Sequence, residues 1–83
     1  DRYFNLGIFL RRESKEDEAL KMFKKEIKVS GLYKAYLEVS KIYTLQNNFK
    51  EAKNYISIAR KKYPENTEIK NFHNFLFSKT AQK

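Results

Sequence analysis

The same arrangement of large apolar and small residues occurs twice along this chain, 33 positions apart. Ala19 in the first copy corresponds to Ala52 in the second, and large apolar residues surround both alanines at the same spacing. The members of the two copies, in chain order, are Tyr3, Leu6, Gly7, Leu10, Ala19 and Phe23, then Tyr36, Val39, Ser40, Tyr43, Ala52 and Ile56. A repeat of this length is typical of solenoids built from stacked helix pairs.

A third, truncated copy follows at the same interval, with Ile69, Phe72, His73 and Leu76 in the corresponding positions. His73 stands where the other copies have a small residue, and it would clash with a second helix of its own repeat. The chain ends too soon after this segment to form that second helix. We therefore expect residues 66–80 to form a terminal capping helix.

Apolar residues at helical spacing predict five helices, over about residues 2–12, from after Ser14 to 29, 33–45, 49–62 and 67–79. Ser14 with Asp17, and Asn48 with Glu51, fit capping boxes, and Asn66 is a further cap. The expected stops are Ser30-Gly31, Asn47-Asn48 and Tyr63-Pro64.

The predicted fold is therefore an all-α, helix-turn-helix repeat solenoid in one domain of 83 residues. Repeat one spans residues 1–32, repeat two spans 33–65, and the capping helix completes the five helices. Because antiparallel helices approach closely only where side chains are small, we expect Gly7 to face Ala19 and Ser40 to face Ala52. The chain begins with Asp1 rather than Met, and we expect it to be the C-terminal part of a longer protein.

These residues resemble the tetratricopeptide repeat family, whose pattern has a bulky residue, Leu-Gly and an aromatic on its first helix. The second helix of that pattern carries a small residue, an aromatic, another alanine and then proline. The second copy matches the pattern at Tyr36, Val39, Tyr43, Phe49, Ala52, Ala59 and Pro64, with Ser40 in place of glycine. The first copy departs from it at Glu26, where the family has alanine, and at Gly31, where it has proline.

The resemblance implies a concave surface, lined by the first helix of each pair, that holds a peptide or a helix of a protein partner. The partner-binding positions that it implies are Phe4, Ile8, Arg11, Arg12, Lys34, Leu37, Lys41, Lys70, Asn74 and Phe77, with Glu38, Leu45 and Asn71 in the same set. Apolar anchors and positive charge together favour a partner segment with apolar and acidic residues. The same basic residues also fit a solvated face without a ligand.

A net charge of +8 favours an acidic partner, a nucleic acid or an anionic surface. Part of this charge has a structural explanation, because positive residues near a helix C-terminus complement the helix dipole. The residues of this kind are Lys24, Lys25 and Lys28 in one predicted helix and Arg60, Lys61 and Lys62 in another.

No pattern in the chain indicates catalysis, a cofactor or a metal. Gly7 and Gly31 are too far apart to form a phosphate-binding loop, there is no cysteine, and His73 is the only histidine. We expect His73 to be half-buried and hydrogen-bonded. The acidic clusters lie at predicted helix starts, where capping explains them. No apolar run is long enough to insert into a membrane.

Phe75 and Phe77 lie off the apolar face of the last helix, which indicates a partner surface, a homodimer contact or packing on a part of the protein outside this sequence. The favoured function is a protein–protein interaction module, a scaffold or assembly factor. The alternatives are an RNA-binding helical repeat of the pentatricopeptide type, and helices that only extend a larger solenoid. Nothing in the sequence indicates the cellular compartment.

Overall fold

Five α-helices joined by short turns make up the structure, a computed structural model that describes residues 1–81. The helices are α1 (Arg2–Arg12), α2 (Glu16–Val29), α3 (Tyr33–Leu45), α4 (Phe49–Lys62) and α5 (Thr67–Ala81). These residues contain no β-strand. The all-α class and the five helices are confirmed, and the division into repeats stays a prediction.

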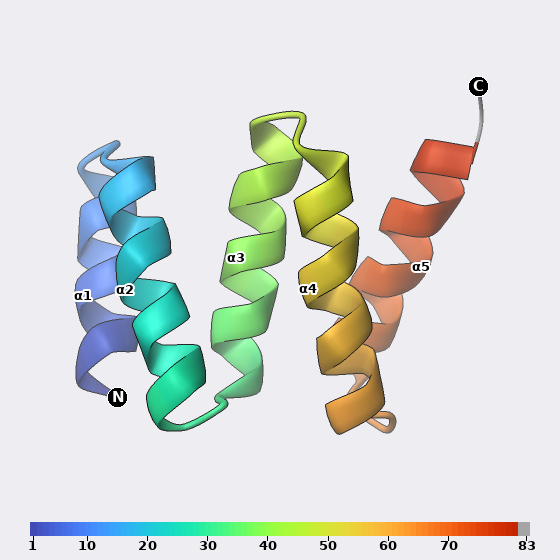
Figure 1. Cartoon of the computed structure of the whole chain (residues 1–83), viewed down its shortest axis with the longest axis horizontal. Helices are drawn as coiled ribbons and strands as arrows, with labels where there is room; N and C mark the ends of the chain where they lie inside the picture. Colours follow the sequence, from blue (N-terminus) through green and yellow to red (C-terminus); the bar gives the residue numbers. More distant parts are fainter. Residues whose placement is uncertain (82–83) are drawn as a thin grey trace.

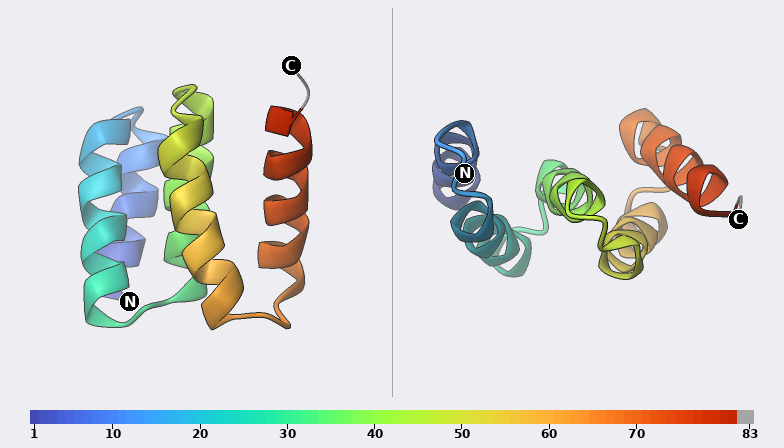
Figure 2. Two further views of the ribbon diagram at one scale, coloured as in Figure 1. Left: turned by 45° about the vertical axis from the view of Figure 1, so that its right-hand side comes forward. Right: turned by 90° about the horizontal axis from the view of Figure 1, so that it is seen from above.

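The helices stand in a row and alternate in direction, with α1 at one end and α5 at the other (Figure 1). Each helix packs on the next one in the chain, and α3 also contacts α5. Seen from above, α2 and α4 lie on one side of the row and α1 and α5 on the other, with α3 between them (Figure 2). The side of α2 and α4, toward the viewer in Figure 1, is called the front face below, and the side of α1, α3 and α5 the back face.

Two apolar clusters form the core. One joins α1, α2 and α3 around Phe23, and the other joins α3, α4 and α5 around Ile56. Three partly buried side chains pack against both clusters, namely Ile27, Tyr43 and Tyr55. The core is therefore continuous from α1 to α5, and it fixes the two faces relative to each other.

The close approach of α1 to α2 depends on Gly7. A Cβ atom added to Gly7 would lie 2.6 Å from Cε1 of Phe23, so the ring of Phe23 fills the space that a side chain would need. We expected Gly7 to face Ala19. The ring that fills the space of its missing side chain belongs to Phe23, one turn after Ala19 along α2, and the approach of Gly7 to Ala19 stays a prediction. Ser40, in the corresponding position of α3, is fully buried, and its hydroxyl has no hydrogen-bond partner.

The turns follow the predicted residues at three of four places. Gly31 has a φ of 68° and ends α2 with a hydrogen bond from its N–H to the carbonyl of Ile27 at 3.0 Å. Asn48 accepts the N–H of Glu51 at 3.4 Å, and Asn66 accepts the N–H of Ile69 at 3.0 Å. These caps confirm the predicted starts of α4 and α5.

The capping box predicted at Ser14 and Asp17 is wrong. Ser14 has a φ of 63°, and its N–H donates to the carbonyl of Arg11 at 3.0 Å, so it belongs to the turn that closes α1. An N-cap residue needs extended backbone geometry, which this conformation excludes. An N-cap at Ser14 would start α2 at Lys15, but α2 starts one residue later, at Glu16. Its N-cap residue is Lys15, whose side chain makes no capping hydrogen bond.

Leu6 is not part of the core, although its position in the repeated pattern predicted burial. It is 43% exposed, whereas Val39, 33 residues later, is 0% exposed. The difference has a simple cause. Helix α2 covers Val39, and no helix among residues 1–81 covers the same side of α1. The same difference separates Phe9, which is exposed, from its counterpart Ile42, which is buried.

None of the helices within residues 1–81 is both long and apolar enough to cross a membrane.

Candidate functional site

A hollow on the back face lies between α1 and α3. Its volume is about 290 Å³, and its lining residues are Ile8, Arg11, Arg12 and Glu38. Nη1 of Arg11 donates to Oε1 of Glu38 at 2.5 Å, and this ion pair joins the two helices. Because Arg11 is neutralised by Glu38, the exposed guanidinium of Arg12 supplies the unpaired positive charge of this hollow.

A second hollow of about 310 Å³ lies on the other side of α3, between α3 and α5. Leu37, Phe72 and Phe75 supply its apolar wall, and Lys41, Glu68 and Asn71 supply its polar wall. The ring of Phe75 is 53% exposed and lies 5.8 Å from that of Phe72, centroid to centroid. An exposed aromatic ring supported by a second ring is a suitable anchor for an apolar side chain of a ligand.

Seven of the predicted positions line these two hollows, and among them are Glu38 in the first hollow and Asn71 of α5 in the second. Ile8, Arg11 and Arg12 share the first hollow, and Leu37 and Lys41 share the second. The side chain of Leu37 is also a member of the core, so it forms a floor rather than an exposed anchor.

The other six predicted residues lie outside both hollows, and one of them is Leu45, exposed at the end of α3. The ring of Phe4 packs on Phe23 with centroids 5.5 Å apart, which places it between α1 and α2. Lys34, Lys70 and Asn74 lie on α3 and α5 but do not line either hollow. The ring of Phe77 lies beside α4 instead of in the back-face hollows.

Phe77 lines a separate hollow of about 500 Å³ with residues of α4. Nζ of Lys53 lies 5.2 Å from the centre of the Phe77 ring, and the imidazole of His73 stacks on that ring at 4.4 Å. His73 is half-buried as expected, but the prediction that it is hydrogen-bonded is wrong for Nδ1, which is buried without a partner.

The sequence did not predict that Glu68, Phe72 and Phe75 line one hollow. The pattern places Phe72 on the apolar face of the last helix and predicts a partner surface, a homodimer contact or packing on another part of the protein for Phe75, while capping explains Glu68 at the start of that helix. Glu68 does lie in the first turn of α5, but it also accepts a hydrogen bond from the hydroxyl of Tyr33 at 3.2 Å. The spacing of these residues along α5 places them on one helical face, and this signal could have found them.

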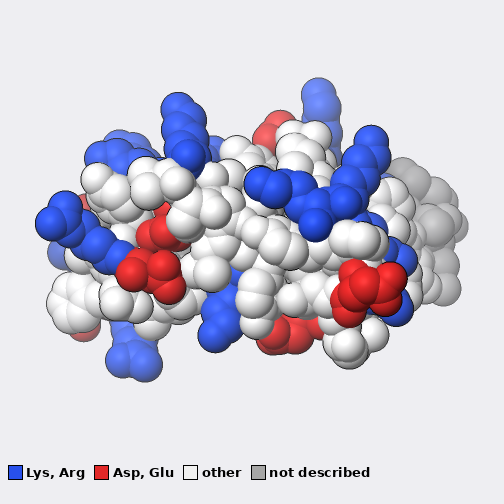
Figure 3. Space-filling view, turned by 90° about the horizontal axis from the view of Figure 1, so that it is seen from below, with Lys and Arg blue, Asp and Glu red and all other residues white. Residues whose placement is uncertain are grey.

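The two back-face hollows carry nearly balanced charge, because Glu38 pairs with Arg11 and Glu68 lines the same hollow as Lys41. The excess of Lys and Arg is therefore distributed over other parts of the surface. At the lower end of the molecule, basic side chains stand out from the edges and acidic side chains lie in small groups between them (Figure 3).

Within residues 1–81, no three His, Cys, Asp or Glu side chains are grouped so that they could hold a metal ion. Comparison of the chain with models of known families, with curated proteins and with solved structures finds no match. Functional inference therefore depends on the geometry of the surfaces themselves.

Proposed function

We propose that this chain is a protein–protein interaction module that holds a segment of a partner along its back face. The observation that carries the proposal is the pair of hollows on the two sides of α3. Each hollow combines apolar side chains with charged side chains of both signs. Apolar anchors flanked by polar groups are typical of surfaces that bind peptides.

The charge balance defines the partner more closely than composition alone. Arg12 and Lys41 attract carboxylates, and Glu68 attracts a basic group. A bound segment therefore needs at least one large apolar side chain for Phe75, with acidic and basic residues on either side of it. Such mixed charge fixes the register of a bound segment and excludes partners of the wrong pattern.

A tetratricopeptide-type repeat is part of the proposal. Ala19 and Ala52, at the predicted helix crossings, are both fully buried, and so are Phe23 and Ile56 one turn later. Equal burial at positions 33 residues apart supports two repeated helix pairs, followed by α5 as a cap. In such an arrangement the first helices of the pairs, α1 and α3, supply the binding surface.

RNA binding through the back face is less well supported. Phosphate groups need a continuous track of positive charge, and Glu38 and Glu68 interrupt any such track between α1 and α5. The balanced charge thus favours a protein segment over a nucleic acid.

The experiment is selection of peptides from a random display library, followed by mapping of the amide shifts that a selected peptide causes in the ¹⁵N-labelled chain. We expect the largest shifts at residues of α1, α3 and α5 that line the two hollows. Largest shifts on α2 and α4 would contradict the proposed face. Tighter binding of a random single-stranded RNA than of any selected peptide would contradict the proposed class of partner.

A further inference from the structure

A further hollow lies on the front face, along α2, with Tyr55 of α4 as its one lining residue from another helix. Its volume is about 620 Å³, roughly twice that of either back-face hollow. None of the proposed partner-binding residues of the back face lines it. Its lining residues are Lys21, Met22, Lys24, Lys25, Ile27, Lys28 and Tyr55.

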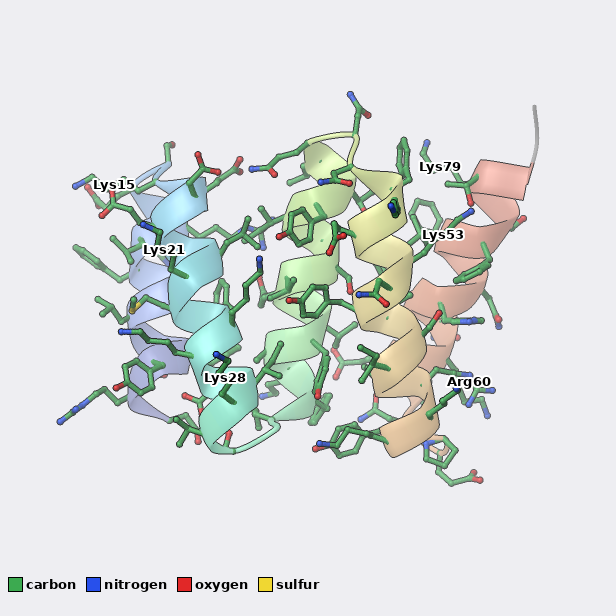
Figure 4. The ribbon with its side chains drawn as sticks, in the orientation of Figure 1. Lys15, Lys21, Lys28, Lys53, Arg60 and Lys79 are labelled. Carbon is green, nitrogen blue, oxygen red and sulfur yellow. The ribbon has the colours of Figure 1, made fainter. Side chains whose placement is uncertain are left out.

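The lining has four lysines and no acidic residue. Lys21 and Lys28 are exposed and lie seven residues apart, which places them about 10 Å apart along one side of α2. Figure 4 shows both side chains on α2, with Lys53 and Arg60 on α4. Of the four lysines only Lys28 lies in the last turn of α2, so the expectation that the helix dipole also explains Lys24 and Lys25 is wrong.

Lys24 holds a fixed positive charge at the base of this hollow. Its Nζ donates to the hydroxyl of Tyr43 at 2.5 Å and lies 5.1 Å and 5.7 Å from the ring centres of Tyr43 and Tyr55. The hydrogen bond to Tyr43 is the largest cause that raises the pKa of Lys24 above its usual value, and burial opposes it. Lys24 is therefore charged at neutral pH.

Apolar surface completes the floor. Met22, Ile27 and Tyr55 are each half-buried, so part of each side chain remains accessible to a ligand. A partner that covers these three side chains would remove apolar surface from water, and this stabilises the complex. The charged groups of the lysines alone do not provide such apolar surface.

We infer that the front-face hollow binds an acidic amphipathic helix of a protein partner. Apolar side chains of that helix lie on Met22, Ile27 and Tyr55, and two of its carboxylates, seven residues apart, pair with Lys21 and Lys28. Helices laid into grooves use this combination of apolar anchors and flanking charge. The inference is independent of the proposed function, because it uses α2 and α4 instead of α1, α3 and α5.

A nucleic acid fits this hollow less well than a helix. One face of the Tyr55 ring is stacked with Tyr43, with centroids 6.0 Å apart, and Lys24 lies over the same ring. Base stacking, a main source of affinity for single strands, needs an open ring face, whereas an apolar side chain needs only the part of half-buried Tyr55 that remains accessible. Phosphates would also leave Met22 and Ile27 uncovered.

The test uses a synthetic helical peptide of about sixteen residues with glutamates seven apart, leucines on the adjoining face and a single tryptophan among them. The chain contains no tryptophan, so the fluorescence of the peptide reports binding directly. We expect Lys21→Glu with Lys28→Glu to weaken binding about tenfold or more, and Lys21→Gln with Lys28→Gln to weaken it less. Lys61→Glu with Lys79→Glu changes net charge equally outside the hollow, and we expect an effect below about threefold.

Four results would overturn the inference: no binding of the glutamate peptide, equal binding of the same peptide with lysine for glutamate, equal weakening by the two pairs of charge reversals, and displacement of the peptide by a random single-stranded RNA. Circular dichroism of each variant checks that it is folded. Lys41→Glu with Phe75→Ala, on the back face, should leave the affinity for this peptide unchanged. A loss of binding there would place the peptide on the back face, which contradicts the inference and leaves the proposed function intact.

Discussion

The carboxylate of Glu26 accepts a hydrogen bond from the backbone N–H of Phe4 at 3.0 Å, so that a side chain of α2 caps the first turn of α1. The same carboxylate accepts the hydroxyl of Ser30 at 2.5 Å, and Glu26 is only 3% exposed. Asp1, the N-cap residue of α1, makes no side-chain hydrogen bond of its own. Glu26, which departs from the tetratricopeptide pattern, thus has a structural role in this chain.

Glu26 makes the stability of the fold depend on pH. The hydrogen bond from Ser30, followed by that from Phe4, holds the pKa of Glu26 below its ordinary value of 4.5, and burial opposes this shift. A lowered pKa stabilises the folded state above the ordinary value, and this contribution is lost as the pH falls through the folded-state pKa. We expect Glu26→Gln to lose less stability than the wild type between pH 6 and pH 3, as measured by urea unfolding.

The matched control is Glu65→Gln, since Glu65 is exposed in the turn before α5. It should keep the pH dependence of the wild type. Identical pH dependence of the wild type and Glu26→Gln would show that the cap from α2 to α1 does not contribute.

Replacement by alanine should have opposite effects at Gly7 and Ser40, 33 residues apart. Gly7→Ala gains about 1 kcal/mol of helix propensity, but its Cβ meets the fully buried ring of Phe23. Overpacking of this kind costs about 1–3 kcal/mol, and we expect net destabilisation. Ser40→Ala removes a buried hydroxyl without a partner and should stabilise the fold by about 1 kcal/mol.

Urea unfolding of both variants measures these changes. In a Phe23→Leu background, where the ring is absent, Gly7→Ala should cost less than it does in the wild type. Equal costs in the two backgrounds would mean that Phe23 is not the obstacle.

Ser14→Gly should stabilise the turn between α1 and α2. Ser14 has a φ of 63°, a conformation in which glycine is free of the strain that a Cβ atom causes. We expect a gain of up to about 1 kcal/mol. Gly31→Ala is the reciprocal control, because Gly31 has a φ of 68° and should lose a similar amount. A Ser14→Gly variant less stable than the wild type would contradict the role of this turn.

The helices could be predicted from sequence because their limits depend on local features. Apolar periodicity located each helix, and Gly31, Asn48 and Asn66 act within a few residues of themselves. Ser14 was misassigned because its side chain suits an N-cap, while its backbone is set by the preceding turn of α1. Leu6 was misassigned because its burial depends on a neighbouring helix, which α3 has and which α1 lacks within residues 1–81.

The candidate site could be predicted only in part, since it depends on contacts between residues far apart in the chain. Ile8 and Lys41 followed from their positions on the first helices of the predicted pairs. The pairing of Arg11 with Glu38, 27 residues away, sets the charge of the first hollow and leaves no local signal. The front-face hollow was missed for the same reason, because the lysines of α2 acquire a floor only when Tyr55 of α4 packs beside them.

The most direct test of the proposed function compares two pairs of substitutions for their effect on the affinity of a library-selected peptide. Phe75→Ala with Lys41→Glu alters the back face. Ile58→Ala with Lys50→Glu makes the same kinds of change at two exposed positions of α4. Isothermal titration should show a loss of about tenfold or more for the first pair and less than about twofold for the second. If the variant with Phe75→Ala and Lys41→Glu kept its affinity for the peptide while the variant with Ile58→Ala and Lys50→Glu lost it, the result would contradict binding along α1, α3 and α5.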